Sequence, residues 1–518
     1  MKRQPPQMQE KARRQKAFLR VCLLVTGACA LVLEILGTRL ISPYYGSSLY
    51  SWSALITVTL VALAAGYQWG GRLADRSPVL TLAARLLAGA ALSVAVTPAL
   101  RAPALQATAP LGVVLGALGS ALILAAPALV LLSAIGPLAV RLNASELATV
   151  GRSAGETYAI STAGSVVGAV LAGFVLIPRL PLSQILYGMA IVLLLLSAWA
   201  QWLSQERLPL AQPAIAAAVA LYGFWPRPLE STNILLNMES AYGQIKVMDF
   251  DNRRYLLVNG TTQSMAQLPS LTSDSQYAHA MELAAYARPK ARRALVIGLG
   301  AGLMTTALEK EHPLVVDTVE LDPAMVQAAS LFFGFQPKGD VFVEDGRRFL
   351  EQPGARAEGR RYDLILLDAF GGEAPPFQLF TQEAFEAMHR RLSPGGIVAI
   401  NLVSALTGDD AKPWRSAYRT LAAVFPNVRA YAGSEPIEGL GNVVFFASEG
   451  PLPEKVPADA RPSIVAHAKY ALAHRLAAAG ESAELMTDDF APMESMLAST
   501  SVRWRLSLQQ KVSEILLY

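Results

Sequence analysis

Cysteine is almost absent from this chain of 518 residues, which contains only Cys22 and Cys29. Both lie in the first apolar segment, so the sequence supports neither a disulfide framework nor a cysteine metal cluster, and we expect no metal site. Histidine is scarce too, with five residues scattered along the chain. The formal net charge of +4 at pH 7 is too small to indicate a nucleic-acid-binding protein.

Charged residues make up only 16% of the chain, whereas hydrophobic residues make up 53%. Up to about Pro226 the chain is apolar with rare charges, and after it the composition is that of a soluble α/β protein. We therefore predict a polytopic helical membrane domain over residues 1–226. The remainder is expected to form a small β-strand segment over 227–274 and a Rossmann-like α/β domain with a helical tail over 275–518.

A transmembrane helix needs about 20 apolar residues, and seven segments reach or approach that length. They are residues 21–36, 54–70, 79–100, 111–140, 159–177, 185–203 and 210–225. The fourth contains Pro127 and Pro137, so we expect a kinked or broken helix there. The GxxxG spacing of Gly164 and Gly168 predicts close packing of two helices.

The second half of the chain predicts a β segment followed by a doubly wound sheet. Residues 232–237, 242–249 and 253–258 alternate in polarity between turn residues, which is typical of short antiparallel strands. From about residue 275, five apolar runs alternate with helical stretches and predict a mostly parallel sheet. These runs are ALVIGL, VDTVEL, VFVE, DLILLD and GIVAIN. We expect a further strand at VVFFAS (443–448) and a largely helical tail over 462–518.

Glycines and a carboxylate follow the first two of these runs. In VIGLGAG (296–302), Gly298, Gly300 and Gly302 allow a tight turn and a close approach to a ligand at a helix N-terminus. Glu320 follows Gly302 by 18 residues, at the tip of the next strand, where a carboxylate can accept both ribose hydroxyls.

Two further carboxylates follow the later runs. We expect Asp345 at the next strand end, within reach of a base amino group, and Asp368 one strand further on. No phosphate-binding lysine directly follows the glycines, which excludes a P-loop. A dinucleotide or an S-adenosyl compound fits this pattern, and the lack of a clear second nucleotide-binding half favours the S-adenosyl compound.

The segment from about 240 to 450 resembles the spermidine synthases, the polyamine aminopropyltransferases. The matching pieces are LLVNGTTQSM (256–265), Tyr277, VIGLGAG, VELD (319–322), EDG (344–346), YDLILLDAF and LFTQEAF (379–385). With its apolar half included, the chain resembles the bacterial membrane-fused spermidine synthases on residues 33–52, 70–76 and 487–495.

This resemblance implies a multi-pass protein of the bacterial inner membrane, in contact with the lipid bilayer, and it leaves room for a homo-oligomer. The basic N-terminus and the arginines in alternate loops predict a cytoplasmic N-terminus. Seven crossings would then place the second half outside, away from the supply of an adenosyl donor. We therefore favour a miscount at the fourth or the seventh segment and a cytoplasmic catalytic domain.

The resemblance also implies a role for each matching residue. The donor, decarboxylated S-adenosylmethionine, would be bound by Gln263, Gly298, Gly300, Gly302, Glu320, Asp322, Asp345 and Gly346. Asp368 would be the catalytic carboxylate, and Tyr277 would help to position the attacking amine. The aminopropyl group would be transferred to putrescine or another polyamine, and methylthioadenosine would be released. A strand-end carboxylate can orient the acceptor ammonium group and accept its proton.

The chain departs from this family at two positions. The soluble enzymes carry aspartates where this chain has Ala301 and Gly371, and both aspartates help to bind cationic amino groups. The residues that we consider as substitutes for substrate binding are Glu373, Asp488, Asp489 and His279. Each also has an ordinary interpretation: a solvated loop charge for Glu373, a helix cap for the two aspartates, and a core or surface residue for His279.

Two alternative functions stay open on the sequence. An S-adenosylmethionine-dependent methyltransferase is favoured by Ala301, while Gln263 and Tyr277 argue against it. A transporter or sensor with a non-catalytic nucleoside-binding domain is suggested by charged residues in or beside the apolar segments, such as Glu34 and Glu156. The same charges can instead form structural ion pairs.

Overall fold

The structure, a computed structural model, divides into two compact units, Met1–Pro228 and Leu229–Tyr518. It describes residues 6–46, 49–143, 150–205, 210–225, 233–352, 354, 357–370, 375–436, 439–456, 458, 460–477, 483–497, 500 and 503.

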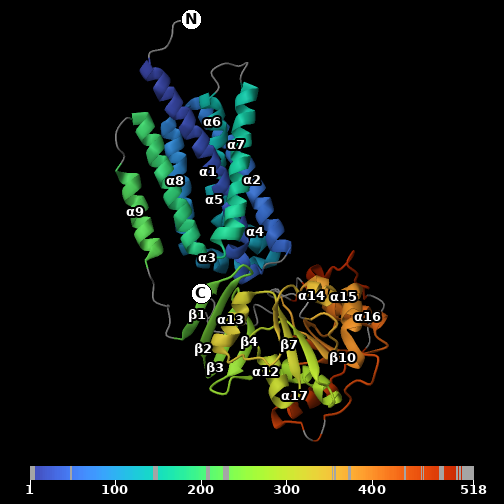
Figure 1. Ribbon diagram of the computed structural model, residues 1–518. Coiled ribbons are helices and arrows are strands. Elements are labelled where there is room, and N and C mark those ends of the chain that lie inside the picture. Colours follow the sequence, from blue (N-terminus) through green and yellow to red (C-terminus); the bar gives the residue numbers. More distant parts are fainter. Residues whose placement is uncertain are drawn as a thin grey trace. The chain divides into compact units, whose positions relative to one another are not determined.

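The first unit is built from helices that pack side by side (Figure 1). They are α1 (Pro6–Tyr45), α2 (Leu49–Arg76), α3 (Leu80–Thr108), α4 (Gly112–Leu124), α5 (Ala126–Ser133), α6 (Ile135–Asn143), α7 (Val150–Leu171), α8 (Leu182–Gln205) and α9 (Ala211–Phe224). Helix α1 packs on α7, and α3 packs on α8. The α1–α7 contact is as close as the glycine spacing predicts, because a Cβ atom on Gly164 would lie 2.0 Å from the carbonyl oxygen of Leu24.

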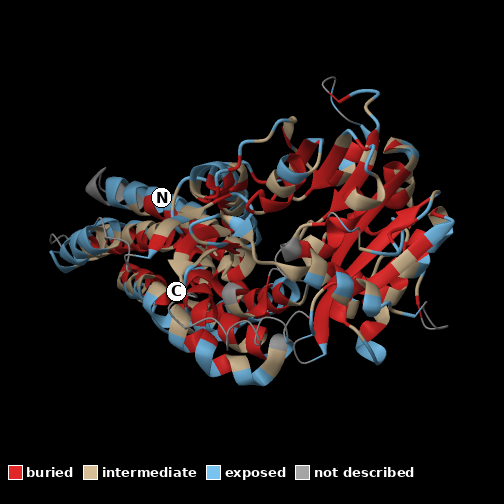
Figure 2. Ribbon diagram, turned by 90° about the horizontal axis from the view of Figure 1, so that it is seen from below, coloured by how far each residue is buried: buried red, intermediate tan, exposed pale blue. Residues whose placement is uncertain are grey.

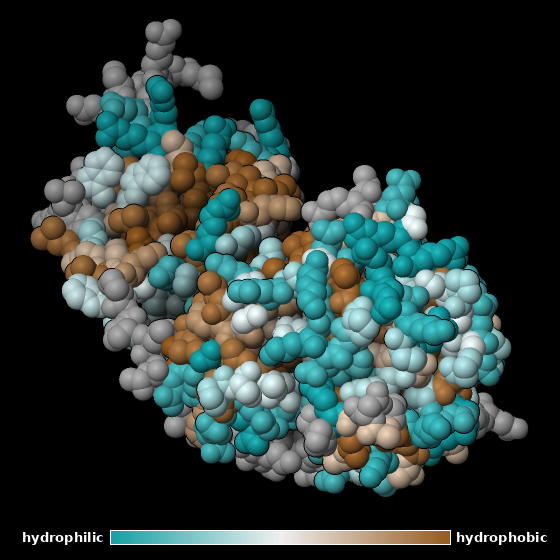
Figure 3. All heavy atoms as spheres, turned by 60° about the horizontal axis from the view of Figure 1, so that its bottom comes forward, coloured by the Kyte–Doolittle hydropathy of each residue, from teal (hydrophilic) through white to brown (hydrophobic). Residues whose placement is uncertain are grey.

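Six helices among the described residues are long and apolar enough to cross a membrane, one fewer than the sequence predicted. They are Arg13–Ser42, Tyr50–Arg76, Leu80–Leu111, Ala126–Asn143, Val150–Leu176 and Leu182–Gln205. Apolar side chains cover a broad area of this unit's surface in Figure 3, and Leu92 and Phe174 are 65% and 77% exposed.

Of the two suspected segments, the fourth still contributes one span, Ala126–Asn143, and the seventh accounts for the difference. The predicted fourth segment is divided into α4, α5 and α6, because Pro127 and Pro137 have no N–H group to donate within a helix. The predicted seventh segment forms α9, whose 14 residues are fewer than the about 20 that span a bilayer.

The second unit begins with an antiparallel sheet of five strands in sequential order. The strands are β1 (Ile234–Glu239), β2 (Gln244–Phe250), β3 (Arg253–Val258), β4 (Thr261–Gln267) and β5 (Thr272–Ser273). The sequence predicted the first three. It missed β4 because the segment TTQSMAQ is polar and has no apolar alternation.

A second sheet has seven strands in the order β11-β12-β10-β9-β6-β7-β8. The strands are β6 (Arg293–Ile297), β7 (Val315–Glu320), β8 (Val341–Val343), β9 (Tyr362–Leu367), β10 (Leu392–Ala405), β11 (Asn427–Ala432) and β12 (Leu440–Ser448). The strands β10, β9, β6, β7 and β8 are parallel to one another, as predicted. At one side of them, β12 pairs antiparallel with β10, and β11 pairs antiparallel with β12.

Helices cover both faces of this sheet, so its strands are buried on both sides (Figure 2). In β9, Leu364 and Leu366 face α10 (Gln276–Met281), α11 (Leu283–Ala287), α12 (Leu303–Glu311) and α17 (Pro462–Ala473). Ile365 and Leu367 face α14 (Gly346–Glu351), α15 (Gln382–Arg391) and α16 (Lys412–Val424). Helix α13 (Pro323–Phe332) contacts β7 and β2. Burial on both faces explains why the strands appear in the sequence as unbroken apolar runs.

The tail is helical only in part, over α17 and at the described residues 493–497, 500 and 503. Helix α17 ends at Ala473, and the described residues from 474 to 492 contain no helix. This stretch is instead fixed by side-chain contacts with the sheet domain, such as the hydrogen bond from Met486 N–H to Thr420 Oγ1 at 3.0 Å.

Candidate functional site

Three parallel strands end level with one another at one edge of the sheet. Ile297, the last residue of β6, is in register with Val319 of β7 and with the last residue of β9. The residues that follow at this level are Gly298, Glu320 and Asp368. The chain moves from β6 toward β7 and β8 on one side and then crosses to β9 on the other. Ligands of open α/β sheets bind at such a reversal of strand order.

This strand order corrects one expectation. The sequence suggested that Asp368 follows the strand next to that of Asp345. In the structure β9 lies directly beside β6, and two strands, β6 and β7, separate it from β8. Asp368 is therefore adjacent to the glycine loop. Asp345 follows β8, which is the strand at one edge of the sheet.

The glycine loop has a backbone that only glycine adopts easily. Gly298, Gly300 and Gly302 have φ angles of 95°, 52° and 74°. A Cβ atom on Gly298 would lie 2.2 Å from the carbonyl oxygen of Asp368, which leaves no room for a side chain. Ser264 of β4 accepts a hydrogen bond from the Ala301 N–H at 3.0 Å and so ties the first sheet to this loop. Gln263, the predicted donor ligand, precedes Ser264 on the same strand.

Glu320 is fixed by the same loop. Its carboxylate accepts hydrogen bonds from the backbone N–H groups of Leu299 at 2.9 Å and Asp322 at 2.8 Å. Burial raises the pKa of Glu320, and these hydrogen bonds act in the opposite direction. Each carboxylate oxygen keeps a further lone pair, so the group can still accept two hydroxyl groups. Asp322 caps α13 by accepting a hydrogen bond from Ala324 N–H.

Asp345 and Gly346 lie at the start of α14. The Asp345 carboxylate caps this helix by accepting a hydrogen bond from Arg348 N–H at 2.9 Å. A Cβ atom on Gly346 would lie 2.6 Å from the side chain of Ile297, so the glycine lets the helix start close to the end of β6.

Asp368 is fixed by one hydrogen bond on each carboxylate oxygen. Oδ2 accepts from the hydroxyl of Tyr277 at 3.1 Å, and Oδ1 accepts from the amide of Asn401 at 2.9 Å. Burial raises the pKa of Asp368, and both hydrogen bonds lower it. Burial and the neighbouring carboxylate raise the pKa of Tyr277 well above its ordinary value, so its hydroxyl stays protonated and donates. The pair predicted from the sequence is thus in direct contact.

Asn401 and Asn442 were missed by sequence reasoning. Asn401 is 1% exposed, and its amide oxygen accepts a hydrogen bond from the Asn442 amide at 2.9 Å. The Asn442 oxygen accepts in turn from the hydroxyl of Ser434 at 3.3 Å. Because a carboxylate can only accept, Asp368 fixes the direction of this whole chain of hydrogen bonds. The available signal was a lone amide at the end of each apolar run, in GIVAIN and GNVVFFAS.

The residues considered for the acceptor do not gather at Asp368. Asp488 accepts two hydrogen bonds from Arg347, at 3.0 and 2.8 Å, and one from the Thr381 hydroxyl. Asp489 is exposed. His279 stacks on His467, with ring centroids 5.3 Å apart, in the wall of a separate cavity.

Glu373 and Gly371 lie outside the described residues. Among the described residues, no group of three or more His, Cys, Asp or Glu side chains could hold a metal ion.

Comparison with known proteins identifies relatives of the second unit. Residues 276–451 match the spermine/spermidine synthase domain. The chain is 32% identical over 217 residues to a polyamine aminopropyltransferase of Vibrio vulnificus, which covers 39% of this chain and 69% of the relative. It is also 32% identical over 161 residues to an N-terminal histidine N-methyltransferase of Emericella nidulans, covering 30% of this chain and 28% of that relative. A crystal structure of a probable spermidine synthase from Corynebacterium glutamicum aligns with a TM-score of 0.37 and 21% identity, covering 46% of this chain and 87% of that one.

The strand order and the level strand ends define a Rossmann-like domain, and the matched family makes it a transferase domain. The chain belongs to the spermine/spermidine synthase family and carries an aminopropyltransferase domain. Members of this family use decarboxylated S-adenosylmethionine as co-substrate and release methylthioadenosine.

Proposed function

We propose that this chain is a membrane-anchored aminopropyltransferase that moves an aminopropyl group from decarboxylated S-adenosylmethionine to putrescine or another amine. The observation that carries the proposal is the Asp368 carboxylate, which lies beside the glycine loop and is held by Tyr277 and Asn401.

In this proposal the adenosyl group lies along the carboxyl edge of β6, β7 and β8. Glu320 accepts the ribose hydroxyls, and Asp345 lies toward the adenine amino group. The glycine backbone supports the donor beside Gln263. Asp322 and Gly346 act indirectly, by fixing the starts of α13 and α14.

The proposed reaction is a single displacement. The neutral amine attacks the methylene carbon bonded to the sulfonium, a C–N bond forms, and the C–S bond breaks with its electron pair moving to sulfur. The products are the aminopropylated amine and the thioether methylthioadenosine. Asp368 accepts the proton of the attacking amine, and the Tyr277 hydroxyl keeps the carboxylate oriented. Glu373, five residues after Asp368, remains our candidate for a second ammonium group of the acceptor.

Membrane anchoring is supported by the six apolar helices of the first unit. An even number of crossings returns the chain to the side of its N-terminus, and the basic N-terminus favours the cytoplasm. We therefore propose a multi-pass protein of the bacterial inner membrane with a cytoplasmic catalytic unit, where the adenosyl donor is available.

The direct test is incubation of the purified full-length chain with decarboxylated S-adenosylmethionine and a panel of amines, followed by mass spectrometry. We expect aminopropylated product with at least one amine, and none with the Asp368→Asn variant. A second candidate, methyl transfer, is favoured by Ala301 and by the Emericella relative. Methylated amine formed from S-adenosylmethionine, without aminopropyl transfer, would establish that alternative and refute our proposal.

A further inference from the structure

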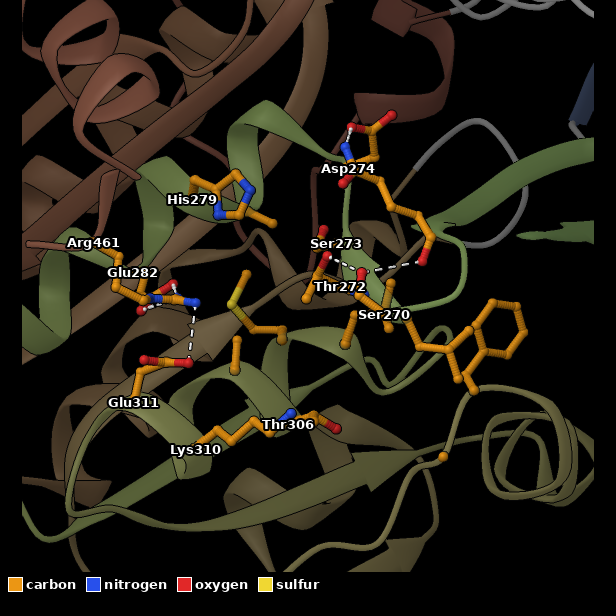
Figure 4. Close-up of a pocket in the computed structure, with 18 of the residues that line it drawn as sticks. Ser270, Thr272, Ser273, Asp274, His279, Glu282, Thr306, Lys310, Glu311 and Arg461 are labelled. Atoms are coloured by element: carbon orange, nitrogen blue, oxygen red, sulfur yellow. Dashed lines mark hydrogen bonds and ion pairs between the residues drawn. The ribbon is translucent and has the colours of Figure 1, made fainter. Parts of the chain in front are cut away.

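A cavity of about 480 Å³ lies along the flank of α12, apart from the site described above. Its wall is formed by the turn and strand around β5, by α10, α12, the residues after α13, and the region of α17 (Figure 4). The lining contains neither Asp368, Tyr277 and Glu320 nor the three loop glycines. We call it the α12 cavity. Its volume is in the range of small-molecule binding sites.

Every carboxylate in the wall of the α12 cavity already has a cationic partner. Asp274 pairs with Arg253 at 2.6 Å. Glu282 accepts two hydrogen bonds from Arg461, both at 2.8 Å, and Glu311 pairs with the same arginine at 3.2 Å. A cationic ligand such as a polyamine would have to displace these pairs, so the acidic residues do not favour it.

In contrast to these carboxylates, two cationic side chains of the wall have hydrogen-bond donors without a partner among the described residues. Lys310 has no hydrogen bond or ion pair within the part of the chain that the structure describes. Its side chain runs along α12 toward Thr306, one turn earlier on the same helix face (Figure 4). Arg461 keeps a buried Nε–H group without a partner among the described residues. The hydroxyls of Ser270 and Thr272 lie on the opposite wall and are already hydrogen-bonded to each other at 2.9 Å, so they add no free donor. The unused polar capacity is therefore that of donors and of one positive charge.

The rest of the wall is mixed: Gln267, Ser273, His279 and His467 are polar, and an apolar part lies beside Lys310. Leu303, Met304 and Phe333 are 8%, 9% and 3% exposed and line the cavity beside these donors. An apolar wall with a few convergent polar groups is the usual composition of a site for a small organic molecule.

We propose that the α12 cavity binds a small organic carboxylate. Its carboxylate group would pair with Lys310 and accept a hydrogen bond from Thr306, while its apolar body would contact Leu303, Met304 and Phe333. A charge-assisted hydrogen bond of this kind favours an anion over a neutral or cationic analogue of the same shape.

The test uses the full-length chain in detergent micelles and the probe 4-(trifluoromethyl)phenylacetate, observed by fluorine NMR against a blank of empty micelles. The neutral amide of the same acid and the amine 4-(trifluoromethyl)benzylamine serve as comparison ligands. We expect the acid to bind the wild-type chain, and both comparison ligands to bind at least several times more weakly.

Two variants locate the binding. Lys310→Gln removes the charge from an exposed and unpaired residue, and Ala307→Leu fills the cavity while leaving the charge in place. Each should weaken binding of the acid about tenfold, the effect of one charge-assisted hydrogen bond or of lost space. Lys290→Gln, at an exposed lysine outside the cavity, should bind as the wild type does. The proposal is overturned if the wild-type chain does not bind the acid above the blank, if Lys310→Gln or Ala307→Leu leaves binding unchanged, or if the amine binds more tightly than the acid.

Discussion

At the scale of single residues, the reactivity of Asp368 depends on opposing influences. Burial raises its pKa, whereas the hydrogen bonds from Asn401 and Tyr277 favour the charged form and lower it. In the proposed reaction Asp368 is the base and must be deprotonated to accept a proton, so the balance between these influences would set the pH below which the reaction is lost.

The first prediction concerns Asn401. In Asn401→Leu the carboxylate loses a donor, so the pKa of Asp368 rises further above its ordinary value. The acidic limb of the kcat/KM profile should move to higher pH, and kcat at neutral pH should fall about tenfold. Asn427→Leu, which changes an asparagine exposed at the start of β11, is the matched control. An unshifted acidic limb in Asn401→Leu would show that this amide does not tune Asp368.

The second prediction concerns Gly298. Gly298→Ala would place a Cβ atom 2.2 Å from the backbone oxygen of Asp368, whereas Gly359 has a similar positive φ of 71° with no atom within 4 Å of its Cβ position. Both substitutions introduce backbone strain of about 1–2 kcal/mol, but only the first also forces β6 and β9 apart. Denaturant unfolding should show the larger loss for Gly298→Ala, together with weaker binding of methylthioadenosine. Equal losses in the two variants would contradict this packing.

The sequence alone indicated the candidate residues at this edge of the sheet, whose roles stay predictions, but not the side chains that hold Asp368 in place. Glycines after an apolar run and acids at strand ends are recognisable because the chemistry restricts them to a few residue types. Asn401 and Asn442 are single amides in apolar strands, and their pairing joins positions 41 residues apart. No local pattern contains that information, because it depends on the pairing of β10 with β12.

At the scale of elements, the order of the strands was the main property that the sequence did not contain. The apolar runs of β6, β8 and β9 would be equally well buried on both faces if the strands were arranged in the sheet in a different order. Their pairing is decided by long-range packing of helices on both faces. Strand β4 was missed for a different reason, because its side chains are polar where they approach the glycine loop.

The third prediction tests the link between the two sheets. Ser264→Ala leaves the N–H of Ala301 without its partner, at a cost of about 1–3 kcal/mol if no water replaces the hydroxyl. The glycine loop should become less well ordered, and the dissociation constant for methylthioadenosine, measured by calorimetry, should rise severalfold. Ser330→Ala removes an exposed hydroxyl on α13 and should leave binding unchanged. Equal affinities of the two variants would remove β4 from the donor site.

At the scale of the whole molecule, hydropathy identified the apolar unit but not the number of its helices that are long enough to cross a membrane. Pro127 and Pro137 divide one apolar segment, and α9 is short, so the count depends on helix length as well as on composition. In the proposed membrane arrangement, an even or odd count decides on which side of the bilayer the second unit would lie.

The fourth prediction tests the proposed orientation. Cys22 and Cys29 are 0% and 6% exposed, so a cysteine introduced at the exposed Glu358 would be the accessible thiol among the described residues. In Glu358→Cys, a membrane-impermeant maleimide should label inside-out vesicles and leave intact spheroplasts unlabelled. Labelling of intact spheroplasts would place the catalytic unit outside and contradict six crossings from a cytoplasmic N-terminus.

The central claim is aminopropyl transfer at Asp368, and its most direct measurement is the yield of both products from one reaction. The full-length chain, supplied with decarboxylated S-adenosylmethionine and an accepted amine, should release methylthioadenosine and aminopropylated amine in equal amounts. Asp368→Asn should form neither product while still binding methylthioadenosine, because the nucleoside contacts of Glu320 and the glycine loop remain. Methylthioadenosine without an aminopropylated product, or unchanged turnover by Asp368→Asn, would contradict the account.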